Sequence, residues 1–139
     1  MSQADRDQLQ NILEQKKEWL IKMRDITRQC AGMLENDDVD AFAGSLEARE
    51  GIIVKIDAFS KMEKQISAAD DAQILVLKQD IRGIIQEIIQ LDEQNTAQAQ
   101  LKLELYKDEL KNLNQKKQGI GKYINAYQKT DAFYFDEKK

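Results

Sequence analysis

The chain has 139 residues and a net charge of −4, with acids and bases interleaved, so it is one domain by length and gives no indication of a nucleic-acid partner. It contains no proline, which breaks helix interiors, and this absence favours long helices. Histidine is also absent and Cys30 is the only cysteine, which excludes a histidine-based catalytic pair and an internal disulfide. The composition does not exclude catalysis by carboxylates alone. We expect an all-α protein that is not an enzyme and uses no cofactor or metal.

The first segment predicts a helix over residues 4–35. Apolar residues recur there in three columns at helical spacing, a stripe broad enough to face a bundle core. Lys16 and Thr27 interrupt the stripe, while Trp19 and Cys30 lie on it and are expected to be core residues rather than a binding hot spot and a reactive thiol. The columns are Leu9, Lys16, Met23, Cys30; Ile12, Trp19, Ile26, Met33; and Leu13, Leu20, Thr27, Leu34.

The polar run at residues 36–38 predicts a turn and an N-cap, because short polar side chains compete with helical hydrogen bonds. Carboxylates also cluster around this turn, but their spacing does not match a calcium loop, so capping is the better interpretation. A second helix is predicted over residues 38–64. Arg49 falls on its apolar stripe, and we expect this side chain at the rim of the core, near Glu47 or Glu50.

After a turn near residues 65–70, a third helix is predicted over residues 70–127. Its heptad stripe runs from Ile74 to Asn95, where the polar residue is interpreted as a register device. The stripe resumes from Ala99 one step out of register, which is typical of a stutter. The helix is either continuous or broken near residue 95, and the lack of glycine and proline there favours continuity. Residues 1–127 would then form an antiparallel bundle or coiled-coil hairpin of three to four long helices, followed by an irregular aromatic tail over 128–139.

A helix this long would extend its apolar stripe beyond Ala99, where it needs a cover. The first helix, a second copy in a homodimer, or a partner protein would each supply one. The aromatic tail either packs back on the bundle or anchors a partner. The candidate partner-binding residues on the stripe and the tail are Leu103, Tyr106, Leu110, Leu113, Ile120, Tyr123, Ile124, Tyr127, Phe133, Tyr134 and Phe135.

Three segments, in this order along most of the chain, resemble the FlgN/FliT-like flagellar type III export chaperones. The first is an acidic turn and helix over residues 34–56 that contains LEAREGIIVKI, the second is EIIQLDEQN over 87–95, and the third is KKQGIGKYINAY over 116–127. These motifs are coiled-coil-like. The nearest matches are Arg49-Glu50, Leu91-Asp92-Glu93 and Ala126-Tyr127.

The resemblance implies a cytoplasmic chaperone that binds the amphipathic helical termini of a hook-associated or filament-cap protein. It further implies delivery of that client to the export ATPase complex and the export gate, with Tyr123 or Tyr127 docking at the gate. A cytoplasmic location without membrane insertion is also expected because the chain shows neither a secretory signal nor an apolar run of roughly 18 residues. The alternative is a structural coiled-coil spacer or oligomerisation module without a client.

Overall fold

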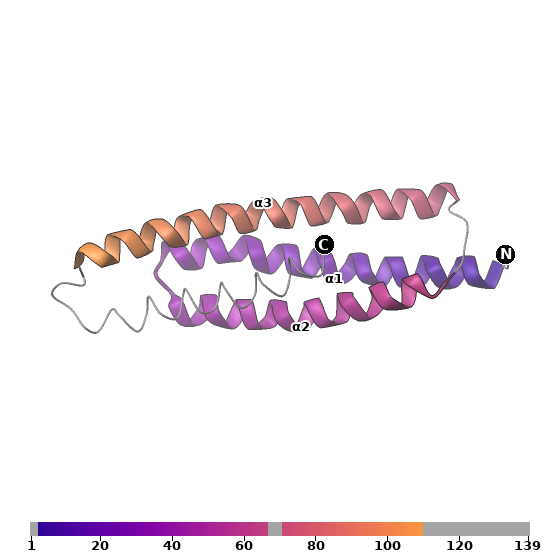
Figure 1. Cartoon of the computed structure of the whole chain (residues 1–139), viewed down its shortest axis with the longest axis horizontal. Helices are drawn as coiled ribbons and strands as arrows, with labels where there is room; N and C mark the ends of the chain where they lie inside the picture. The colour runs from indigo at the N-terminus through magenta and orange to yellow at the C-terminus, as the bar shows by residue number, and fades with distance from the viewer. Residues whose placement is uncertain (1–2, 67–70, 110–139) are drawn as a thin grey trace.

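The computed structural model describes residues 3–66 and 71–109, and in these ranges it contains three helices and no strand. They are α1 (Gln3–Glu35), α2 (Val39–Lys64) and α3 (Ala72–Glu109). The helices lie side by side in an elongated bundle, in which α2 runs antiparallel to α1 and α3 runs parallel to it (Figure 1). The expected all-α class is confirmed, and the bounds of α1 and α2 fall within one residue of the predicted ones.

The first helix is the shared partner of the other two. It packs closely against both α2 and α3, whereas α2 and α3 make no close backbone contact with each other. In Figure 1, α1 accordingly lies between them. A helix with neighbours on two sides must bury a wide face, which accounts for the three apolar columns of α1.

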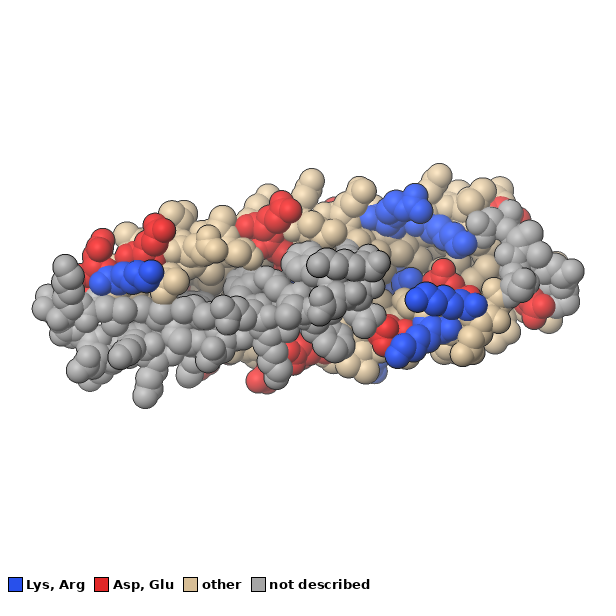
Figure 2. All heavy atoms as spheres, in the orientation of Figure 1, with Lys and Arg blue, Asp and Glu red and all other residues tan. Residues whose placement is uncertain are grey.

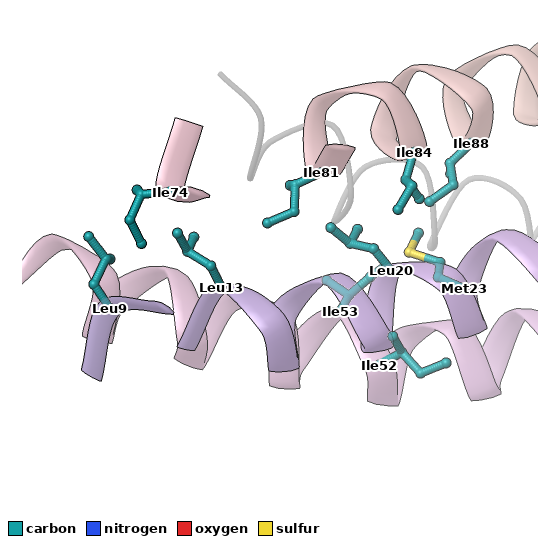
Figure 3. Packing of buried hydrophobic residues seen from close by; sticks show 10 residues of the cluster. All are labelled: Leu9, Leu13, Leu20, Met23, Ile52, Ile53, Ile74, Ile81, Ile84 and Ile88. Atoms are coloured by element: carbon teal, nitrogen blue, oxygen red, sulfur yellow. The ribbon is translucent and has the colours of Figure 1, made fainter. Parts of the chain in front are cut away.

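The core consists of two apolar clusters that follow each other along the bundle. Each large side chain buried in them contributes about 1.5–3 kcal/mol relative to its exposed state. The first cluster, labelled in Figure 3, contains Leu9, Leu13, Leu20, Met23, Ile52, Ile53, Ile74, Ile81, Ile84 and Ile88. The second contains Cys30, Leu34, Phe42 and Leu46, near the turn between α1 and α2.

The turn between α1 and α2 is capped as the sequence predicts. Asp37 adopts a left-handed backbone conformation with φ of 56°, which reverses the chain. The Asp38 side chain then accepts a hydrogen bond from the backbone N–H of Ala41 at 3.1 Å, which satisfies one of the free donors at the start of α2. From α3, the Lys102 ammonium reaches the Asp37 carboxylate at 3.0 Å and the Glu35 carbonyl at 3.3 Å.

At the other end of the bundle, Asp71 fixes the start of α3. Its carboxylate accepts a hydrogen bond from the backbone N–H of Ile74 at 2.9 Å and pairs with the Arg6 guanidinium of α1 at 2.5 Å. The hydrogen bond from Arg6 lowers the pKa of the Asp71 carboxyl, and the bond from Ile74 lowers it further. Exposed pairs like this one contribute little stability, but here the pair sets where α3 begins along α1.

The third helix is uninterrupted through Asn95 and Thr96. It spans 38 residues from Ala72 to Glu109, a length of about 57 Å at 1.5 Å per residue. Continuity across the expected stutter is therefore confirmed, and no break occurs near residue 95. The rest of the predicted third helix, residues 110–127, and the tail over 128–139 lie outside the described ranges.

Replacing Asp38 by alanine should destabilise the protein, because α2 loses the acceptor for the Ala41 N–H. The expected loss is about 0.5–2 kcal/mol in the free energy of unfolding, measured by urea denaturation. Asp38→Asn is the matched control, since an amide oxygen caps nearly as well. Equal losses in the two variants would contradict the capping role.

Candidate functional site

The least expected feature of the core is a buried ion pair between α2 and α3. The Arg49 guanidinium donates two hydrogen bonds to the Asp92 carboxylate, at 2.5 Å from Nη1 to Oδ1 and 2.9 Å from Nη2 to Oδ2. The residues are 0% and 2% exposed. The prediction that Arg49 lies at the rim near Glu47 or Glu50 is wrong. Its carboxylate partner comes from another helix, 43 residues away in sequence, and this partner allows the charge to be buried.

A second buried contact adds α1 to this arrangement. The Asn95 side chain of α3, 2% exposed, donates a hydrogen bond from Nδ2 to the Thr27 carbonyl at 2.9 Å. The Thr27 hydroxyl donates within α1 to the Met23 carbonyl at 2.7 Å, so the polar side chains of Thr27 and Asn95 both form hydrogen bonds inside the bundle. We call Thr27, Arg49, Asp92 and Asn95 the polar layer. It contains residues of all three helices and lies between the two apolar clusters.

Cys30 lies beside the polar layer and is 1% exposed. Burial raises the pKa of its thiol to about 11, an effect that the Arg49 charge opposes and the Asp92 charge reinforces. At neutral pH the sulfur is therefore a protonated thiol, which is a weak nucleophile and a poor metal ligand. The position agrees with the structural role expected for Cys30.

The four residues of the polar layer are almost fully buried, and its contacts pair Arg49 with Asp92 and Asn95 with Thr27. Across residues 3–66 and 71–109, no group of three or more His, Cys, Asp or Glu side chains is placed to hold a metal ion. The contacts of the polar layer constrain how the three helices align. They require Asp92 of α3 to face Arg49 of α2 while Asn95 faces Thr27 of α1.

The candidate partner-binding residues fall into two groups. Leu103 and Tyr106 are half-buried, and Tyr106 packs against the second apolar cluster. This part of the stripe is therefore partly covered within the bundle itself. The remaining candidates, from Leu110 to Phe135, lie outside the described residues.

The exposed leucines near the end of α3 were missed by the heptad analysis. Leu101 is 62% exposed and Leu105 is 61% exposed, four residues apart and therefore on one face of the helix. Both fall outside the heptad stripe that was assigned to the core. The sequence does contain a signal for this surface, because two apolar residues four positions apart lie outside the core stripe.

Charged side chains are mixed over the described surface. On the face in Figure 2, lysines and arginines gather mainly toward the right end, where aspartates and glutamates lie among them, and basic and acidic side chains also meet at the left end. Several pairs link α1 to its neighbours, including Lys17–Asp80 at 3.1 Å and Lys16–Glu63 at 3.2 Å. The Lys16 ammonium thus lies against a carboxylate at the edge of the core. None of the described helices is long and apolar enough to cross a membrane.

Comparison with protein-family models, with curated proteins and with solved structures finds no match to this chain. The arrangement of the helices and their contacts is therefore the basis for inferring what the protein does.

Removing one member of the buried pair should be far more damaging than removing both. Arg49→Met or Asp92→Val alone should lower the free energy of unfolding by about 3–5 kcal/mol, because one charge stays buried without its partner. The double variant should recover more than half of that loss in urea denaturation. Arg82→Met, at an exposed arginine of α3, should change stability by less than about 0.5 kcal/mol. Additive losses in the double variant would contradict the pairing.

Cys30 should resist thiol reagents in the folded protein. A pKa raised from 9.0 to about 11 lowers the thiolate fraction at pH 8 by about 100-fold relative to an ordinary thiol, and burial also blocks access. The rate of reaction with a disulfide reagent is measured in buffer and in urea. Comparable rates in the two conditions would show that the thiol is accessible in the folded state.

Proposed function

We propose that this protein is a cytoplasmic flagellar export chaperone. It binds the amphipathic helical termini of a hook-associated or filament-cap protein and delivers that client to the export ATPase complex and the export gate. The site proposed for the client is the C-terminal end of α3, from Leu101 to Glu109.

The observation that carries this proposal is the exposure of Leu101 and Leu105. Lys102 lies beside Glu35, the last residue of α1, so α3 continues past the end of its main packing partner. The two leucines form an exposed apolar row, whereas Leu103 and Tyr106 of the same helix end are half-buried. An apolar row on a helix is what an amphipathic helix of a partner covers when it completes a bundle.

The resemblance to the export chaperones supports the same function. Two of its three segments, LEAREGIIVKI and EIIQLDEQN, contribute Arg49 and Asp92, which meet in the buried ion pair. Two of the matching residues therefore join α2 to α3 in the core. A folded bundle suits a chaperone that must present one face to a client helix, since a preformed surface costs less ordering on binding.

Replacing the two leucines by glutamine should weaken client binding without unfolding the bundle. Synthetic C-terminal helices of hook-associated and filament-cap proteins are titrated against the wild type and the Leu101→Gln/Leu105→Gln variant by calorimetry. Burial of each leucine is worth about 1.5–3 kcal/mol, and a tenfold change in Kd is about 1.4 kcal/mol, so the loss should exceed about tenfold.

The matched control is Leu75→Gln/Val76→Gln, at side chains that are 47% and 55% exposed near the start of α3. This variant should bind the client helices as the wild type does. Equal weakening in both variants, or no binding of any client helix by the wild type, would contradict the chaperone function. A tight, concentration-independent oligomer in light scattering that the leucine substitutions dissociate would instead favour the spacer or oligomerisation module.

A further inference from the structure

A second surface lies on the outer side of the seam between α1 and α2. Trp19, the only tryptophan of the chain, is half-buried there and packs against the edge of the first apolar cluster. Lys22 of α1 and Lys55 of α2 each place an ammonium nitrogen 4.3 Å from the centroid of its ring. One aromatic ring thus holds two positive charges, which come from different helices, at a single point of the surface.

Both lysines keep their charges available to another molecule. They are exposed, and within the described residues neither ammonium pairs with a carboxylate, in contrast to Lys16 and Lys17 on the same helix. Two carboxylates lie within one turn of Lys22 on α1, Glu18 before it and Asp25 after it, but the Lys22 ammonium lies over the Trp19 ring. An ammonium group has three donors, and those that do not face the ring can bond to an incoming carboxylate.

The neighbouring part of α2 leaves room for a partner to approach. Gly51 and Ala58 lie one turn before and after Lys55 on the same face, and both are exposed. A side chain added at Gly51 would meet no atom within 4 Å. At these two positions of α2, no large side chain stands between Lys55 and a partner.

We propose that Trp19, Lys22 and Lys55 form a docking surface for an acidic helix of another protein, one with two carboxylates a turn apart. Since both nitrogens lie 4.3 Å from the ring centre, at most about twice that distance separates them. Glutamates at positions i and i+4 of a helix have Cβ atoms about 5–6 Å apart, so their carboxylates match this spacing. An apolar residue between them would cover the exposed edge of the indole ring.

A protein helix fits this surface better than an anionic membrane does. The chain has a net charge of −4, which opposes approach to a negatively charged lipid surface. The surface also stands apart from the proposed client site. Trp19 lies 16 residues before the end of α1 at Glu35, or about 24 Å along the helix axis. Its test is therefore independent of the chaperone proposal.

The test uses the full chain and two synthetic helical peptides of equal composition. In one peptide, two glutamates stand at i and i+4 beside a leucine; in the other, they stand at i and i+2, on different sides of the helix. Binding is measured by calorimetry and by the fluorescence of Trp19, which is the sole indole reporter. The first peptide should bind saturably and about tenfold more tightly than the second, as the loss of ion pairs predicts.

The Lys22→Gln/Lys55→Gln variant should lose that preference. Lys22→Arg/Lys55→Arg should keep it, because arginine preserves both the charges and the cation–π contacts. The control Lys64→Gln/Arg82→Gln removes the same charge at two other exposed positions and should bind like the wild type.

Four results would overturn the proposal. They are the absence of a saturable signal with the first peptide, equal affinity for the two peptides, equal weakening in the control variant, and binding of phosphatidylglycerol vesicles in place of the peptide. Circular dichroism checks that each variant remains helical. If the glutamine variant does not remain helical, the arginine variant and the two peptides still provide a test.

Discussion

The bundle depends on the buried contact between Arg49 and Asp92. Long helices with isoleucine and leucine at heptad spacing can pack in several registers, because a shift of about one turn, or 5.4 Å, replaces one aliphatic contact with a similar one. Such a shift would leave Arg49 and Asp92 as separate charges in an apolar interior, at a cost of several kcal/mol per ion. The pair therefore selects one register from several that hydrophobic packing alone would allow.

Asn95 applies the same restriction between α3 and α1. Its amide reaches the Thr27 carbonyl only when the two parallel helices are aligned as observed. Together the two contacts fix α3 against both other helices, although α3 makes close backbone contact only with α1. The apolar clusters on either side supply most of the stabilisation, while the polar layer determines which residues meet in them.

Local features of this fold are readable from the sequence, and the polar layer shows where local reasoning ends. The cap at Asp38 and the columns of α1 follow from residue spacing within one helix. The role of Arg49 does not, because its partner is 43 residues away and either Glu47 or Glu50 was nearer in the chain. The burial of Asp92 could not be predicted from its neighbours in sequence for the same reason. The heptad stripe from Ile74 to Asn95 places Leu91 in the core. In the structure Leu91 is half-buried and Asp92 is almost fully buried, because Asp92 pairs with the buried Arg49.

The central position of α1 also bears on how the chain folds during synthesis. The first helix emerges first and meets α2 across a short turn, so this hairpin forms from contacts between neighbouring segments. The contacts of α1 with α3 join residues 59 to 68 positions apart, as in Arg28–Glu87 and Thr27–Asn95. One apolar side of α1 therefore stays uncovered until the ribosome has added most of α3. Arg49 likewise lacks its contact with Asp92 until then. The nascent hairpin exposes that apolar side until then, and the buried pair can close only after Asp92 has been synthesised.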